Sequence, residues 1–323
     1  MPTLLFQTAE DRLGDALIKL PALRALKAAR PDIRLVWTTS ERPSAFARGL
    51  APLVEGVIDE LHEQTGIGAR WRDALFAACN RTFDAVVASD RRLRPTLALR
   101  RLHTGRFIAP LRGFLLSDRR PDGAFGTWPV YRQTQCLLEL AVDAALSLPR
   151  TLTLPAPYVE MAARLLPPGP TFVGFAPGAG GRDKCWPLAC FIEVARAQVA
   201  RGRRPVFFLG PEERPWRAEL AAAVPDALFP EDAPEATSLA GPPLSIALAG
   251  RLRAAVANDA GAGHLLAAGG QPLVSLFGHT DPRKFEPPYG TRRVLRARDY
   301  GSDHVTGIPL AAVIEALDDV CGG

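Results

Sequence analysis

The chain has 323 residues, of which 47% are hydrophobic and 23% are charged, so it can form a full core and is not a disordered protein. Its five cysteines are an odd number without a C-x-x-C pair, which argues against a disulfide framework or a zinc ribbon. The N-terminus lacks the long apolar stretch of a signal peptide, and no segment approaches the ~18 apolar residues of a membrane span. With a modest net charge of +5, we expect a cytoplasmic protein of two domains.

Short apolar runs alternate with helix-like segments through the first half of the chain. Strands are expected at residues 4–8, 33–38, 57–61 and 83–89, and helices at 15–30, 42–49, 70–80 and 130–147. This alternation predicts a parallel sheet covered by helices on both faces. The Pro-rich run after residue 147 places the domain boundary near 152, with one domain at 1–152 and the other at 153–323.

The second half repeats the same alternation. Strands are expected at 172–175, 206–209, 254–257 and 273–277, and helices at 188–201, 213–223, 244–251 and 262–268. A closing helix at about 308–320 could pack back on the N-terminal domain. The sequence therefore predicts two successive α/β units.

Positive charge gathers in one segment of the first half. Residues 91–120 hold nine arginines against one acidic residue, Asp118. One interpretation is a solvated surface, because the chain uses arginine for nearly all its positive charge; the other is contact with an anionic partner. The segment has almost no aromatic residues for base stacking and matches no nucleic-acid motif, so a phosphorylated small molecule or a lipid head group is favoured over nucleic acid.

Three strand-to-helix loops are candidate sites, because ligands of open α/β sheets bind beyond the carboxyl ends of the strands. The first loop is E-D-R-L-G-D at 10–15. Asp15 lies at the start of a helix, where it is either an N-cap or a general base facing the space between the domains.

The second loop is F-A-P-G-A-G-G-R-D-K-C-W-P at 175–187. Gly178, Gly180 and Gly181 leave room for a ligand near the backbone, and Lys184 supplies a mobile cation, as in a phosphate cradle. The loop is neither a Walker A motif nor G-x-G-x-x-G, so an ordinary turn with a solvated lysine is the alternative. The lack of G-x-G-x-x-G after the first strand of either half argues against an NAD-dependent dehydrogenase.

The third loop is N-D-A-G-A-G-H-L at 258–265. Asp259 ends a strand, Gly261 and Gly263 open the turn, and His264 lies in the first turn of the next helix. A lone histidine there is more often capped or packed in the core, but the neighbouring aspartate and glycines favour a functional site.

Taken together, these segments resemble glycosyltransferase family 9, the ADP-heptose:lipopolysaccharide heptosyltransferase family. The resemblance rests on five stretches in the family's order: R-L-G-D-A-L-I-K-L-P-A-L-R-A-L-K at 12–27, P-G-A-G-G-R-D-K-C-W-P at 177–187, F-F-L-G-P-E-E-R at 207–214, N-D-A-G-A-G-H-L-L-A-A-G-G-Q-P at 258–272 and L-F-G-H-T-D-P at 276–282. It implies an α/β fold of GT-B architecture, with two Rossmann-like parallel-sheet domains facing a central cleft. The first domain would bind the acceptor and the second the nucleotide-sugar.

The resemblance also implies an inverting transfer that uses no metal and no cofactor. Asp15 would take the proton from the acceptor hydroxyl, and Lys184 would stabilise the diphosphate leaving group. The other implied donor contacts are Glu213 to the ribose, Asp259 to sugar hydroxyls, backbone N–H groups at Gly261, Gly263 and His264 to the phosphates, and the loop glycines Gly178, Gly180 and Gly181. The phosphate loop departs from the family where it commonly has Ser or Thr, because Ala179 stands beside two of these glycines.

The family's acceptor is a phosphorylated lipopolysaccharide core, which gives the basic segment a purpose. Arg91, Arg92 and Arg94 are the expected acceptor contacts, with peripheral contact at the inner face of the membrane. ADP-heptose is the expected donor, and no nucleic acid is expected to bind. Two alternatives are a nucleotide-sugar epimerase of the same architecture and a non-catalytic nucleotide-sugar-binding protein.

Overall fold

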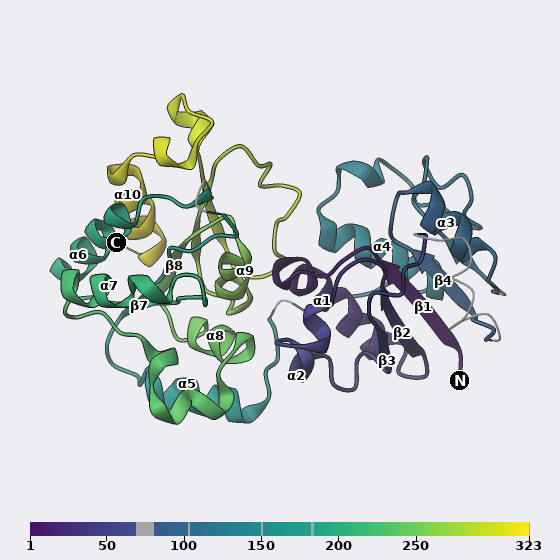
Figure 1. Ribbon diagram of the computed structural model, residues 1–323, viewed down its shortest axis with the longest axis horizontal. Helices are drawn as coiled ribbons and strands as arrows, with labels where there is room; N and C mark the ends of the chain where they lie inside the picture. The colour runs from purple at the N-terminus through teal and green to yellow at the C-terminus, as the bar shows by residue number, and fades with distance from the viewer. Residues whose placement is uncertain (69–80, 103, 150, 182–183, 323) are drawn as a thin grey trace. The chain divides into compact units, whose positions relative to one another are not determined.

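The computed structural model describes residues 1–68, 81–102, 104–149, 151–181 and 184–322, so the helix expected at 70–80 lies outside the described residues. The chain divides into two compact units, each coloured by residue number in Figure 1. The first unit is Met1–Pro149 with Arg283–Glu286, and the second is Arg150–Pro282 with Pro287–Gly323. None of the described helices is both long enough and apolar enough to cross a bilayer.

The first unit is a parallel sheet with helices between its strands. Its elements in chain order are β1 (Thr3–Thr8), α1 (Leu13–Ala29), β2 (Arg34–Thr39), α2 (Ala51–Val54), β3 (Glu60–His62), β4 (Ala85–Ala88), α3 (Leu93–Arg100), β5 (Phe107–Ile108) and α4 (Val130–Val142). Among the described residues the sheet has five strands in the order β3-β2-β1-β4-β5. The chain reverses direction across the sheet between β1 and β4, so that loop edge is where a ligand is expected.

Apolar side chains of the central strands pack on both faces of this sheet. Leu5, Val86 and Phe107 point to one face, where they form a core cluster with Leu99 of α3. On alternate positions Phe6 of β1 stacks on a tryptophan of β2 with ring centroids 4.5 Å apart. Helix α1 packs against α4.

The second unit repeats this plan with a parallel sheet that also has five strands among the described residues. Its elements are α5 (Ala156–Leu165), β6 (Phe172–Ala176), α6 (Leu188–Ala200), β7 (Arg204–Phe207), α7 (Arg217–Ala223), α8 (Pro242–Ala249), β8 (Ala254–Asn258), α9 (Gly261–Ala268), β9 (Leu273–Phe277), β10 (Arg292–Arg296) and α10 (Leu310–Cys321). The strand order, within the described part of the chain, is β10-β9-β8-β6-β7, with every pairing parallel. Here the chain reverses between β6 and β8.

Strand β6 shows how the sequence produces two cores. Its alternate residues Val173 and Phe175 belong to a cluster with α6 and α10, whereas Phe172 and Ala176 belong to a cluster with α5, α8 and α9. Side chains of a strand alternate between the faces, so a strand buried on both sides must be apolar at every position. The run F-V-G-F-A meets that requirement.

The structure confirms the predicted alternation of strands and helices in both halves, with differences at some elements. Strand β10, with the sequence R-R-V-L-R, was not predicted because its arginines hide the period of an edge strand. Helices α3 and α5 were also missed. Helix α10 uses its apolar face in the second unit's own core through Val313, Ala316, Leu317 and Cys321. The expectation that this helix packs back on the N-terminal domain stays a prediction.

Candidate functional site

One buried amide joins the two central strands of the second unit at their carboxyl ends. Asn258, the last residue of β8, is 1% exposed. Its Nδ2 donates to the carbonyl of Pro177 at 2.7 Å, and its Oδ1 accepts from the backbone N–H of Trp186 at 3.0 Å. Both partners belong to the loop after β6. Asn258 therefore fixes the two ends of the glycine-rich loop that carries Lys184, at the point where the strand order reverses.

The indole of Trp186 anchors the same loop from its other side. The ring is 1% exposed, packs edge-on against Phe191 of α6 at 5.3 Å, and donates from Nε1 to the carbonyl of Ile308 at 3.0 Å. Burying a tryptophan with its N–H satisfied gives a large stabilising contact area. The loop end is thus rigid two residues after Lys184, whose side chain is exposed.

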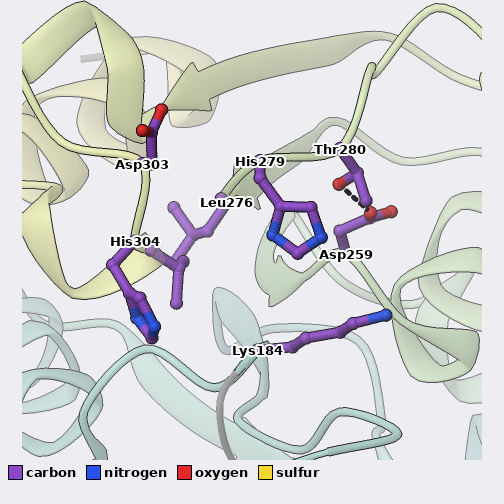
Figure 2. Close-up of a pocket in the computed structure, with 9 residues that line it drawn as sticks. Lys184, Asp259, Leu276, His279, Thr280, Asp303 and His304 are labelled. Atoms are coloured by element: carbon purple, nitrogen blue, oxygen red, sulfur yellow. Dashed lines mark hydrogen bonds between the residues drawn. The ribbon is translucent and has the colours of Figure 1, made fainter.

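Lys184 and Asp259 line one cavity of about 160 Å³ at this strand edge. Figure 2 shows Lys184 extending below the ring of His279, with its ammonium end on the same side of the cavity as Asp259. Thr280, in the loop after β9, donates from Oγ1 to Oδ2 of Asp259 at 2.6 Å. Burial raises the pKa of Asp259, and the hydrogen bond from Thr280 and the charges of Arg292, Lys184 and His279 partly oppose that rise. The cavity offers a cation and an oriented carboxyl to a ligand.

Glu213 lies between two glycines at the ends of β6 and β7. A Cβ atom at Gly178 would lie 2.3 Å from Cδ of Glu213, and one at Gly210 would lie 2.6 Å from Oε2. A side chain at either position would therefore have to displace this carboxyl from its place in the structure. Burial raises the pKa of Glu213. The structure thus brings Gly178 and Glu213 together, whereas no residue in the described part of the chain, apart from its two neighbours in sequence, lies within 4 Å of the Cβ position of Gly180.

The start of α9 differs in part from the expectation that His264 points an N–H group at phosphates. Its backbone N–H donates to the carbonyl of Ala260 at 3.3 Å, because it is already inside the helix. Burial is the main cause that lowers the pKa of His264 to about 4, so the imidazole is neutral at pH 7. A Cβ at Gly263 would lie 2.8 Å from the carbonyl of Asn258, so this glycine lets the helix approach β8. Gly261 is the first residue of α9.

In the first unit, Asp15 occupies the first turn of α1 but does not cap it. The N-cap residue is Arg12, which makes no capping hydrogen bond, and within the described residues the Asp15 carboxylate accepts no hydrogen bond. Burial raises the pKa of Asp15, with Lys19 opposing the rise and Asp11 adding to it. The structure thus removes the N-cap interpretation and leaves a half-buried carboxylate with raised proton affinity after β1.

The three arginines expected to bind the acceptor have different surroundings. Arg92 donates to both carboxylate oxygens of Asp90 and also pairs with Glu41, so its charge is used within the protein. Arg91 donates to Oε1 of Gln133 at 2.9 Å and lies over the ring of Phe125. Arg94 is exposed on α3 and forms no ion pair with any described residue.

Arg91 also lines a cavity of about 640 Å³ in the first unit. The other basic residue there is Arg120, which has no ion pair in the described part of the chain, and Phe114 and Phe125 form an apolar wall. Gly113, Phe114 and Gly123 have positive φ values, so tight turns shape the lining. Arg120 could not be singled out within the basic segment from the sequence, because only the fold brings it beside Arg91.

Comparison with known proteins identifies the family. The family model described as glycosyltransferase family 9 (heptosyltransferase) matches residues 105–305, more than half of the chain. The chain belongs to glycosyltransferase family 9. The matched range contains the Lys184 loop, Glu213 and Asp259 but not Asp15.

Relatives within family 9 agree with this assignment. Lipopolysaccharide heptosyltransferase 1 of Pseudomonas aeruginosa is 38% identical over 137 residues, which are 41% of this chain and 36% of that protein. The chain therefore matches about a third of the length of such curated relatives. Two solved Escherichia coli structures share the fold over nearly the whole chain. ADP-heptose LPS heptosyltransferase II has 21% identity and a TM-score of 0.67, and the match covers 99% of this chain and 98% of that one. Heptosyltransferase WaaC with ADP-2-deoxy-2-fluoro heptose has 20% identity and a TM-score of 0.66, and the match covers 98% of this chain and 99% of that one. The predicted α/β fold of GT-B architecture is confirmed.

Two residues of this family 9 site were not assigned from the sequence. Asn258 and Thr280 both stand in motifs that the sequence analysis singled out, N-D-A-G and L-F-G-H-T-D-P. The signal for Asn258 is its place as the last residue of an otherwise apolar strand, where a buried polar side chain must have a partner. The signal for Thr280 is its place in the loop after β9, at the same edge of the sheet. Which partner it has depends on which strands are neighbours.

Proposed function

We propose that this family 9 protein is an inverting glycosyltransferase that moves a heptose or related sugar from ADP-heptose, or another nucleotide-diphosphate sugar, to a lipopolysaccharide core or related glycan. The observation that carries the proposal is the cavity at the reversal point of the second sheet, which combines Lys184 with the oriented carboxyl of Asp259. The solved relative that contains an ADP-heptose analogue supports this choice of donor.

In the donor site, Lys184 neutralises the charge that develops on the diphosphate as the sugar leaves. Its backbone is held by the Asn258 and Trp186 contacts, while its exposed side chain remains able to reach a ligand. Preorganised charge directed at a leaving group is a large contribution to catalysis. Asp259 accepts hydrogen bonds from sugar hydroxyls, and Glu213 binds the ribose.

In the first unit, Asp15 acts as the general base. Burial raises its proton affinity, and a base whose pKa lies closer to neutrality takes a proton more readily than an ordinary aspartate. The acceptor hydroxyl gives its proton to the Asp15 carboxylate while its oxygen bonds to the anomeric carbon. The bond from that carbon to the diphosphate oxygen breaks, and its electron pair leaves with the nucleotide diphosphate. A single displacement of this kind inverts the anomeric configuration, and it needs no metal when Lys184 supplies the positive charge.

The acceptor site would include Arg91 and Arg120 around the larger cavity, together with the exposed Arg94. Guanidinium groups bind phosphate and carboxylate in a bidentate manner, which suits an anionic glycolipid core. The aromatic wall of Phe114 and Phe125 suits the apolar face of a sugar ring. The reaction would take place in the cytoplasm, with the protein at the inner face of the membrane.

The first test is thermal unfolding with ADP, UDP, GDP, CMP, NAD and ADP-heptose. A ligand at about 100 times its dissociation constant adds roughly 2.7 kcal/mol to the free energy of unfolding. We expect selective stabilisation by ADP and ADP-heptose, lost in Lys184→Met and retained in Lys284→Met, a matched lysine outside the cavity. Stabilisation by UDP or GDP alone would change the donor, and stabilisation by NAD alone would contradict the proposal.

A second test separates transfer from epimerisation. With ADP-heptose but no acceptor, an epimerase converts the sugar, whereas a transferase leaves it intact and releases ADP only when the glycan is added. We expect ADP release to depend on the acceptor, and Arg91→Gln with Arg120→Gln to raise the KM for the acceptor without changing the KM for the donor. Sugar conversion without acceptor would refute the transferase.

A further inference from the structure

A buried ion pair joins Asp11, in the loop before α1, to Lys19 of α1, and Asp15 lies between them in the sequence. Lys19 Nζ is 2.5 Å from Oδ1 of Asp11, and the two side chains are 9% and 0% exposed. Such a pair is costly to bury, and replacing it by apolar residues is often neutral or stabilising. The contribution of this ion pair to stability therefore does not explain its presence. A role in positioning the neighbouring Asp15 is the alternative.

Every polar atom of this pair is used, and the partners come from different segments. Lys19 donates to Oγ1 of Thr8 at 2.9 Å and to the carbonyl of Glu10 at 3.3 Å. The second oxygen of Asp11, Oδ2, accepts from Nε1 of Trp37 at 2.6 Å and from Oγ of Ser44 at 3.3 Å. The end of β1, the start of α1, β2 and the loop after β2 are thus held together around one carboxylate.

The backbone of the loop is fixed by the same residue. The N–H of Ala45 donates to the carbonyl of Asp11 at 2.9 Å, and Asp11 forms a parallel bridge with Ser44. Asp15 follows Asp11 by four residues and precedes Lys19 by four, so Lys19 lies one helical turn below it on the same face. The backbone on both sides of Asp15 is therefore held by this pair.

The pair also balances charge beside Asp15. The charged groups that act on Asp15 are Glu10, Asp11, Arg12 and Lys19. Glu10 is itself paired with Arg12 and with Arg42 at the surface. The charges least screened by solvent are then the buried positive charge of Lys19, which lowers the pKa of Asp15, and the buried negative charge of Asp11, which raises it.

We propose that Asp11 and Lys19 are positioning residues for Asp15: their ion pair fixes the backbone that carries Asp15, and their opposite buried charges together keep its carboxylate a competent base. The proposal rests on the role of Asp15 in the proposed function. Lys19 alone would favour the ionised carboxylate and weaken the base, whereas Asp11 alone would keep the carboxylate protonated. Neither residue contacts a substrate in this account.

The test is a titration of the Asp15 side chain that does not depend on turnover. Protein labelled with ¹³C at the aspartate carboxyls is followed by NMR, and Asp15→Asn identifies the Asp15 signal. We expect Asp11→Asn to lower the pKa of Asp15 by about one unit or more and Lys19→Met to raise it by a similar amount. Lys27→Met is the matched control, because Lys27 lies in the same helix and pairs with Asp59 at 2.7 Å, and it should leave the Asp15 titration unchanged.

Removing both charges together keeps the test decisive if a single variant does not fold. The double variant Asp11→Asn/Lys19→Met buries no lone charge, and we expect its Asp15 pKa to return to within about half a unit of the wild-type value. Single shifts in the same direction, no shift in either single variant, or a double variant shifted as far as a single one would each overturn the proposal.

The same variants distinguish this proposal from the proposed function. If transfer occurs, the acidic limb of kcat/KM should move to lower pH in Asp11→Asn and to higher pH in Lys19→Met, with the KM for the donor unchanged. Opposed NMR shifts in a protein that transfers no sugar would uphold the charge balance and refute the transferase. Variants that transfer sugar, and whose Asp15 titration and acidic limb both match the wild type, would refute the charge balance and uphold the transferase.

Discussion

Replacing Asn258 by alanine should weaken the second unit and loosen the Lys184 loop at the same time. The side chain is 1% exposed and makes two hydrogen bonds, so its loss leaves the carbonyl of Pro177 and the N–H of Trp186 buried without partners. Each such group costs about 1–3 kcal/mol, which gives about 2–6 kcal/mol for the two. Water entering the vacated space would bring the measured value toward the lower end of this range.

The assay is thermal unfolding of Asn258→Ala with and without ADP. At about 2–4 °C per kcal/mol for a domain of this size, a loss of 3 kcal/mol lowers the Tm by roughly 6–12 °C. We also expect weaker ADP binding, because the loop ends that hold Lys184 are no longer fixed. Asn258→Asp should be as damaging, since it keeps the acceptor for Trp186 but cannot donate to Pro177.

The matched control for this prediction is Ser275→Ala. Ser275 is also buried and polar, lies on the adjacent strand β9, and pairs in the sheet with Ala257 of β8. Equal Tm values and equal ADP affinities for Asn258→Ala and Ser275→Ala would refute the reasoning that Asn258 organises the site.

Three further predictions follow from single contacts. Gly178→Ala would place a methyl group 2.3 Å from Cδ of Glu213, so it should weaken ADP binding as much as Glu213→Ala does. In calorimetry the double variant should bind ADP no more weakly than either single variant. His264 has a folded pKa of about 4, below its unfolded value of 6.5, so its contribution to the free energy of unfolding, up to roughly 3 kcal/mol, is present above pH 6.5 and is lost as the pH falls toward 4. In denaturant unfolding, His264→Gln should therefore lose less stability than the wild type as the pH is lowered, and parallel pH profiles of the two proteins would contradict this. Arg92→Ala removes the partner of the buried carboxylate of Asp90, so it should lower the free energy of unfolding by about 1–3 kcal/mol. Arg94→Ala should leave the Tm within about 1 °C of the wild type, and equal changes in Tm for the two variants would contradict the structural difference between the paired Arg92 and the exposed Arg94.

Much of the fold could be predicted from the sequence because the strands are buried on both faces. Runs such as F-V-G-F-A and A-A-V-A-N stand out as short apolar segments between helices, and the structure has strands at both. Strand β10 could not be found this way, since an edge strand with three arginines has no apolar run. The arginine-rich helix α3 was hidden in the same manner by charge.

The site was predictable in its loops but not in its contacts. Lys184, Glu213 and Asp259 stand after strands, and the topology places them at the carboxyl edge of the sheet, where ligands of such folds commonly bind. The pairing of Arg92 with Asp90 and Glu41 could not be seen, because Glu41 is distant in the sequence. The lowered pKa of His264 could not be predicted either, because it depends on burial that only the packed structure defines.

The most direct test of the central claim is a transfer assay of wild-type protein beside Asp15→Asn, with ADP-heptose and a lipopolysaccharide core acceptor. The account predicts that the wild type forms glycosylated acceptor and ADP in equal amounts. Asp15→Asn should bind ADP-heptose as tightly but transfer sugar about 10²–10⁴ times more slowly, which is the usual contribution of a general base. Undiminished transfer by Asp15→Asn would contradict the assignment of the base, and no transfer by the folded, donor-binding wild type would contradict the proposed acceptor.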